Sequence, residues 1–183
     1  MKDVVAHLST DEVYNQACLD HTLDQLPWSG GLNSWNGRGV RIRRGLSPLE
    51  TLQEWEARQE RVRRAWGAIG VNGRIETSVG RYPLRLQAWH LAREYAIHAD
   101  DIGVPIPPQE RKAQLWWRAV FGMFAAREEG DPLHAELSDD HVALRHEGRD
   151  YELDLESFIA YLTGRPQQLK DRKQRALVRQ LLS

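Results

Sequence analysis

The stretch HLAREYAIHADD, residues 90–101, decides how the rest of the chain is interpreted. It is typical of one helix, because apolar residues recur at three- and four-residue steps along one side. Glu94 and His98 lie four positions apart beside this apolar stripe, so both project from the same face, one turn apart. An unpaired charge costs free energy at such a semi-buried position. The pair therefore requires a partner or a bound ion.

An acid and an imidazole at this spacing can bind one metal ion. Carboxylate oxygen and imidazole nitrogen both suit Zn²⁺, Ni²⁺ or Fe²⁺, and a rigid helix sets their separation before the metal arrives. The pattern E-x-x-x-H is weak evidence by itself, since ordinary ion pairs with this spacing are common on helices. A third ligand from another element would make the metal interpretation much stronger.

The helical pattern over residues 3–26 offers that third ligand. His7 stands within the apolar stripe of this first helix. Taken alone, a histidine there is more often a core residue with a hydrogen bond than a metal ligand. His90 is the competing candidate because it precedes Glu94 by four residues, but at His98 the helix face has rotated by about 80° from it.

The clearest helix start is SPLE at residues 47–50. Ser47 is placed to be the N-cap, Pro48 takes the first helical position, and Glu50 can close a capping box. The spacing of apolar residues in this second helix predicts its core face. That face consists of Leu52, Trp55, Val62 and Trp66.

Further elements follow from the same reasoning. WSGGLNSWNGRG, residues 28–39, has four glycines in twelve residues and predicts a long turn-rich loop. TSVGRYP, residues 77–83, predicts an extended or turn segment, and HVALRHEGRDYELDL, residues 141–155, alternates as a β-hairpin does around residues 146–149. Helical patterns cover residues 84–99, 110–128, 156–163 and 168–182.

These elements predict a mainly α-helical fold. We expect a helical bundle over residues 1–130 and a small α+β domain over residues 131–183. A chain of 183 residues suits one ordinary domain, or a principal domain with a smaller appendage.

Composition excludes several classes of protein. The 25 basic and 26 acidic residues nearly cancel, which removes the general attraction that drives nucleic-acid binding. No stretch approaches the roughly 18 consecutive apolar residues of a membrane span, and the N-terminus lacks the apolar core of a signal peptide. We expect a cytoplasmic monomer or homodimer that binds neither nucleic acid nor membranes.

Cys18 is the only cysteine, so no intrachain disulfide can form and a thiolate metal cluster is excluded. Any metal site must use nitrogen and oxygen ligands. Because Cys18 lies in the middle of the first helical pattern, we predict a buried structural residue rather than a nucleophile.

Two further features each allow two interpretations. RGVRIRRG, residues 38–45, is a short basic stretch that we interpret as a solvated connection, with anchoring of an anionic substrate as the alternative. Trp28 and Trp35 in the glycine-rich stretch are expected to cover the end of the bundle core. Contact with a partner chain is the alternative for these two tryptophans.

Three segments, in order, resemble the mycothiol-dependent maleylpyruvate isomerase family within the DinB-like superfamily. They are VVAHL near the start, SVGRYPLRLQAWHLAREYAIHADDIG in the middle and LDLESFIAYLTGRP near the end, so the resemblance extends over residues 1–168. It implies a DinB-like four-helix bundle that binds a divalent metal, typically zinc, through His7, Glu94 and His98. It also implies a small C-terminal α+β domain in which Arg165 faces the site as a catalytic residue.

The resemblance further implies mycothiol or a similar thiol as co-substrate. A metal with three protein ligands keeps an open position, where it can hold a thiol as thiolate near neutral pH. The thiolate would add to a double bond or displace a leaving group, giving isomerisation or S-transfer on a small carboxylated electrophile. Arg165 or residues 38–45 would bind the substrate carboxylates.

Two other functions stay open at this point. One is a non-catalytic metal-binding scaffold or interaction protein, and the other is a hydrolase in which metal-bound water is the nucleophile. The chain also departs from the family pattern, because family members usually have a further helix before the first metal histidine. We therefore expect a bundle without that helix, or one in which the helix over residues 110–128 takes its place.

Overall fold

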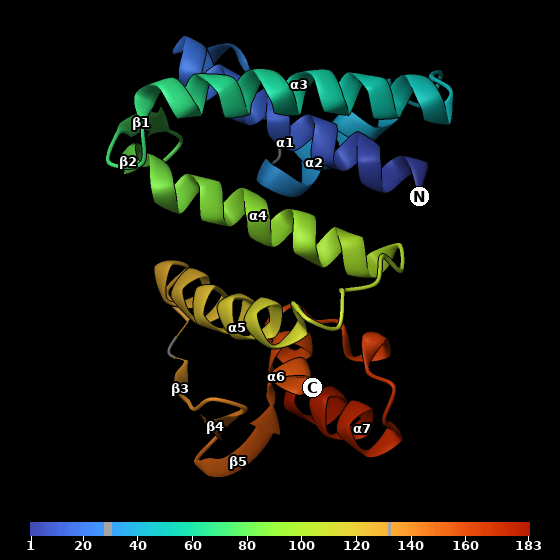
Figure 1. Ribbon diagram of the computed structural model, residues 1–183, viewed down its shortest axis with the longest axis vertical. Helices are drawn as coiled ribbons and strands as arrows, with labels where there is room; N and C mark the ends of the chain where they lie inside the picture. The colour runs from blue at the N-terminus through green and yellow to red at the C-terminus, as the bar shows by residue number, and fades with distance from the viewer. Residues whose placement is uncertain (28–30, 132) are drawn as a thin grey trace. The chain divides into compact units, whose positions relative to one another are not determined.

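The computed structural model describes residues 1–27, 31–131 and 133–183. The chain forms two compact units, residues 1–95 and 96–183, and the boundary falls inside the continuous helix α4 (Leu84–Asp101). As predicted, the protein is mainly helical, with a small antiparallel sheet near the C-terminus (Figure 1). The sequence analysis places a domain boundary at residue 130. The two compact units do not test that boundary, so it stays a prediction.

The N-terminal unit is built on helices that run side by side. Its elements before α4 are α1 (Lys2–Asp20), α2 (Gly31–Ile42), α3 (Pro48–Ile69) and a hairpin of β1 (Arg74–Thr77) and β2 (Gly80–Pro83). α1 and α3 run in the same direction, because Lys2 contacts the backbone just before α3 whereas Tyr14 contacts Ser78 beyond its end (Figure 1).

The start of α3 has the predicted capping box. The Ser47 side chain accepts a hydrogen bond from the Glu50 backbone N–H at 3.2 Å, and Glu50 Oε2 accepts one from the Ser47 backbone N–H at 2.7 Å. The predicted core face of α3 is partly wrong. Val62 is fully buried, but Leu52 is 36% exposed and Thr51 is buried instead. Thr51 tolerates burial because its hydroxyl donates to the Ser47 carbonyl oxygen at 2.9 Å.

The glycine-rich stretch is a helix rather than the predicted loop. Residues 31–42 form α2, and residues 28–30 lie outside the described residues. Gly39 shows why glycine is needed in a helix here: a Cβ atom would lie 1.9 Å from Oγ1 of Thr10 on α1. Glycine therefore allows two helices to approach closely at this position.

Most of the basic stretch is exposed, as predicted for a solvated connection, but one of its arginines is buried. Arg43 is only 4% exposed. Its guanidinium donates to Glu54 at 3.0 and 2.8 Å, to Thr10 Oγ1 at 3.1 Å and to the Gly39 carbonyl oxygen at 2.8 Å. These partners satisfy the buried charge, so Arg43 ties α2 to α1 and α3 and is not available to an anionic substrate.

Trp35 and Cys18 are both buried in the N-terminal unit. The burial of Trp35 agrees with its predicted place over the core, whereas Trp28 lies outside the described residues. Cys18 packs with Ile75 and Leu84 and is 1% exposed, as predicted for a buried structural cysteine. Burial raises the pKa of its thiol to about 11.

The C-terminal unit, residues 96–183, packs helices against a three-stranded sheet of order β3-β4-β5. The predicted hairpin is present, and Glu147 and Gly148 at its turn have φ of 49° and 76°. Phe158 and Val142 are fully buried in the core of this unit. Beyond α4, its elements are α5 (Arg111–Glu128), β3 (His134–Leu137), β4 (His141–His146), β5 (Arg149–Asp154), α6 (Leu155–Leu162) and α7 (Arg172–Leu181).

The last helix, α7, begins four residues later than predicted. Pro166–Gln168 form a 3₁₀ turn, and the Asp171 side chain then caps α7 by accepting from two backbone N–H groups.

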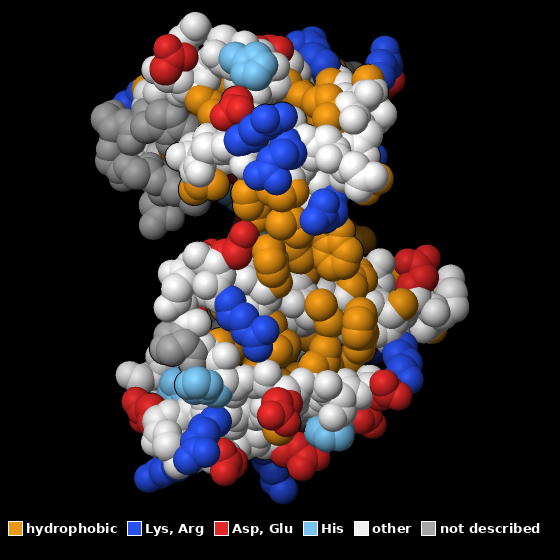
Figure 2. Space-filling view, turned by 90° about the vertical axis from the view of Figure 1, so that its left-hand side faces the viewer, with side chains coloured by type: hydrophobic (Ala, Val, Ile, Leu, Met, Phe, Trp, Pro, Cys, Tyr) orange, Lys and Arg blue, Asp and Glu red, His pale blue; other side chains and the backbone are white. Residues whose placement is uncertain are grey.

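Charged side chains of both signs are interspersed on the face of the C-terminal unit that Figure 2 shows. No helix in the described part of the chain has the length and apolarity needed to cross a membrane.

Replacing Gly39 by alanine is expected to destabilise the protein, because the added methyl group would overlap Thr10. Overpacking of this kind costs about 1–3 kcal/mol, measured as the free energy of unfolding in urea. Gly67→Ala in α3 is the control: its Cβ meets nothing within 4 Å. Alanine there should stabilise the helix by up to about 1 kcal/mol. Equal stability of Gly39→Ala and the wild type would show that α1 and α2 do not approach this closely.

Candidate metal centre

Three possible metal ligands converge from two helices. His7 comes from α1, and Glu94 and His98 come from α4. One ligand atom of each residue lies within 4.8 Å of the others, and no second group of this kind occurs among the described residues. The side chains of His7, Glu94 and His98 are 15%, 37% and 14% exposed. This group could hold one metal ion, as the sequence predicts.

The antiparallel register of α1 and α4 explains this convergence. Gln87 Nε2, near the start of α4, donates to Asn15 Oδ1 near the end of α1 at 2.9 Å. Two turns later on α4, Glu94 Oε2 lies 3.8 Å from His7 Nε2. His98 follows the boundary between the compact units, but α4 is continuous there, and the four-residue spacing places His98 on the face of Glu94.

His98 is oriented by a carboxylate that the sequence patterns do not single out. Its Nδ1 lies 2.8 Å from Oδ2 of Asp101. A carboxylate that accepts a hydrogen bond from Nδ1–H of the ring leaves the lone pair of the other nitrogen, Nε2, for a metal. Partial burial opposes ionisation of Asp101, but Arg165 and His98 outweigh it, and the pKa of this carboxyl lies below its usual value. Asp101 is therefore a charged acceptor at neutral pH.

Arg165 contacts this carboxylate. Its Nε and Nη2 donate to Asp101 at 2.9 and 3.2 Å, and its Nη1 donates to the Thr163 carbonyl oxygen at 2.9 Å. Gln168 adds a further donor to Asp101 at 3.0 Å. Arg165 is thus linked to the candidate centre through Asp101 and His98, and these contacts make it a positioning residue. The expected catalytic role of Arg165 stays a prediction.

Asp11 is a second acidic group that the sequence patterns do not reveal. It lies one turn after His7 on α1, with Oδ2 3.5 Å from His7 Nε2. Burial raises the pKa of Asp11 to about 7; His7 lowers it, whereas Glu94 raises it through repulsion between like charges. Oδ2 of Asp11 is buried and has no hydrogen-bond partner in the described residues. A cation held by the three ligands would offset this negative charge, so the surroundings fit a metal.

A buried acid, Glu12, follows Asp11 directly on α1. Glu12 is fully buried and accepts a hydrogen bond from the hydroxyl group of Tyr95 on α4, which also accepts one from Trp55 Nε1 at 3.3 Å. Burial raises the pKa of Glu12, although the Tyr95 hydrogen bond opposes this shift. Glu12 does not belong to the group of three ligands.

Comparisons of this chain with protein-family models, with curated proteins and with solved structures find no match. The family resemblance therefore rests on the three sequence segments that carry it.

Two imidazoles and one carboxylate form a donor set that suits several divalent cations, and Asp101 provides the outer contact that such sites commonly have.

Replacing Asp101 by asparagine is expected to weaken metal binding about 10–100-fold, the usual effect of losing a carboxylate that orients a histidine ligand. Competition with a fluorescent chelator measures the affinity. Asp140→Asn is the control, because Asp140 pairs with His141 at 2.9 Å in a similar but exposed contact. If Asp101→Asn binds metal as tightly as the wild type, His98 does not depend on Asp101 for its orientation.

Glu12→Gln should make the metal-free protein less sensitive to pH. Native Glu12 has a raised pKa. It therefore holds its proton to higher pH than the unfolded chain does, and its contribution to stability is full below the unfolded pKa and is lost as pH rises through the native pKa. Relative to the wild type, Glu12→Gln should thus gain free energy of unfolding in urea titrations as pH rises above the ordinary glutamate pKa of 4.5 and through the native pKa of Glu12.

The control for this substitution is Glu56→Gln on α3, where the side chain is exposed and water solvates the carboxylate in the folded and unfolded chain alike. Glu56→Gln should leave the pH dependence of unfolding as it is in the wild type. A stability difference between Glu12→Gln and the wild type that stays constant over this pH range would contradict the assignment.

Proposed function

We propose that the chain binds one divalent cation, most readily zinc, through His7, Glu94 and His98. We further propose that it acts as a thiol-dependent isomerase or S-transferase on a small, carboxylated electrophile. The observation that carries the metal part is the approach of the three ligand atoms to within 4.8 Å of one another. The thiol part rests on the resemblance to the mycothiol-dependent maleylpyruvate isomerase family.

The number and type of ligands favour a catalytic metal over a structural one. Structural zinc sites usually close all four positions with protein, whereas catalytic sites use three protein ligands and leave one position for another molecule. Ligand atoms on one tetrahedral zinc ion lie about 3.4 Å apart, since each bond is about 2.1 Å. Separations of up to 4.8 Å therefore require side-chain rotations that bring the ligand atoms up to about 1.4 Å closer together.

When bound, such a cation would lower the pKa of a coordinated thiol and supply a thiolate near neutral pH. The residues of the chain then have separate tasks. Asp101 orients His98 through Nδ1, and Arg165 holds Asp101 in place and ionised. When ionised, Asp11 adds negative charge beside His7, which increases the attraction for a cation.

The thiol itself has to come from solution. Cys18 is the only cysteine of the chain, it is 1% exposed, and burial raises its pKa to about 11. It can neither reach a ligand nor form a thiolate at neutral pH. A small diffusible thiol such as mycothiol fits this requirement.

The metal part is tested by elemental analysis of purified protein after saturation with zinc and removal of free ions. The wild type should retain about one ion per chain, because three ligands converge on one point. His7→Ala and His98→Ala should each lose most of it. His90→Ala is the control, since His90 lies on the same helix but contacts Tyr82 at 3.3 Å and is not in the ligand group. Full metal content in both His7→Ala and His98→Ala would remove the proposal.

The thiol part is tested by calorimetric titration of mycothiol into metal-free and zinc-loaded protein. A thiol-dependent enzyme should bind the thiol only in the zinc-loaded form, and His90→Ala should behave as the wild type does. Equal thiol binding by both forms, or none by either, would contradict thiol dependence. In that case a metal-binding scaffold or a hydrolase would account for the site, and hydrolysis of ester substrates by the zinc-loaded form would separate these two.

A further inference from the structure

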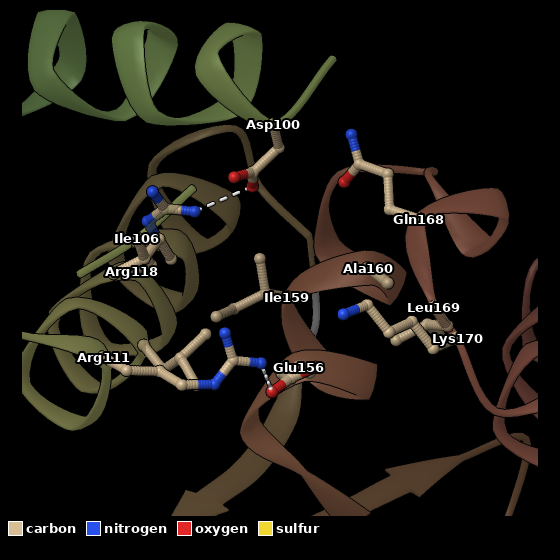
Figure 3. A pocket seen from close by; sticks show the side chains of 11 residues that line it. Asp100, Ile106, Arg111, Arg118, Glu156, Ile159, Ala160, Gln168, Leu169 and Lys170 are labelled. Atoms are coloured by element: carbon tan, nitrogen blue, oxygen red, sulfur yellow. Dashed lines mark hydrogen bonds and ion pairs between the residues drawn. The ribbon is translucent and has the colours of Figure 1, made fainter. Parts of the chain in front are cut away.

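A cavity of about 190 Å³ lies within the C-terminal unit, between the end of α4, α5, α6 and the segment before α7 (Figure 3). Pockets for drug-sized ligands usually start at roughly 300 Å³, so this cavity suits a smaller molecule. All of its lining residues belong to residues 96–183. None of them is a member of the candidate metal centre.

The charges that line the cavity do not cancel. Arg118 donates through Nη1 to Asp100 at 2.7 Å, and Arg111 pairs with Glu156 (Figure 3). Each of these two ion pairs has a net charge of zero. The fifth charged residue, Lys170, extends its ammonium group toward the cavity and has no ion-pair partner in the described part of the chain (Figure 3). The lining therefore carries one net positive charge.

Lys170 is the charged group of the lining that a ligand can reach. The Arg118 side chain is only 9% exposed, and its Nη1 already donates to Asp100. Lys170 is exposed, so an anionic oxygen in the cavity can pair with its ammonium group.

Between the charged groups the cavity surface is apolar. Ile159 and Ile106 project into it, and Leu115, Ala160 and Leu169 also line it (Figure 3). Inorganic phosphate would gain nothing from these aliphatic side chains, whereas a carboxylate with a short hydrocarbon chain would bury its carbon atoms against them. One net positive charge also matches the single negative charge of a carboxylate.

We propose that this cavity is a binding site for a small aliphatic monocarboxylate, whose anionic group contacts Lys170. The site goes beyond the proposed metal- and thiol-dependent function and does not require it. It occupies the C-terminal unit alone, so it should bind its ligand in metal-free protein and in a variant whose metal centre is disabled.

Titration of the metal-free full-length protein with sodium butanoate, followed by NMR chemical shifts, tests the proposal. Binding should be saturable with a dissociation constant of about 1 mM, as expected for a ligand of so few atoms. Lys170→Met should weaken it about tenfold through the lost charge-assisted contact. Lys173→Met is the matched control, because Lys173 is exposed on α7 and does not line the cavity. His7→Ala should bind butanoate as the wild type does.

Further arms examine the chemistry of the ligand. Butylamine and inorganic phosphate should bind much more weakly than butanoate. Absence of saturable butanoate binding, unchanged affinity in Lys170→Met, or equal affinity for butylamine or phosphate would overturn the assignment. Loss of binding in His7→Ala would overturn its independence from the metal centre.

Discussion

The alignment of α1 with α4 depends on polar contacts between the two helices. In a protein interior, a polar group without a partner is costly, so pairs such as Asn15–Gln87 and Glu12–Tyr95 restrict how the two helices can align. A shift of one helical turn would separate both pairs. The same alignment places His7 opposite Glu94, so the geometry of the candidate centre follows from interactions that hold the fold together.

The fold was predictable from sequence where the signal is local. The capping box at Ser47 and the turn at Glu147–Gly148 need only neighbouring residues, and both are present. Glycine has no such single meaning, because it marks a turn in one context and a close approach of helices in another. Gly39 belongs to the second kind, and only the position of Thr10 on α1 reveals this. The choice of Thr51 over Leu52 for the buried side of α3 likewise depends on the neighbouring helix.

The candidate centre likewise has one part that local sequence predicts and another that depends on packing. The spacing of Glu94 and His98 is visible in the sequence, since a helix fixes it. The proximity of His7 depends on helix packing: its place in an apolar helical stripe makes it a candidate, and the resemblance to a known family groups it with Glu94 and His98. Asp101 follows His98 by only three positions, yet the contact that keeps its carboxylate in place and ionised comes from Arg165, sixty-four positions away. Contacts of this range have no periodic signature, which is why sequence patterns do not reveal them.

The buried position of Cys18 has a chemical consequence of its own. An accessible cysteine thiol can be modified by electrophiles and oxidants. Here the thiol is enclosed between Ile75 and Leu84 and keeps its proton at neutral pH. Disulfide exchange and alkylation both require an accessible thiolate, so electrophiles and oxidised thiols in the surrounding solution leave this sulfur untouched while the fold is intact.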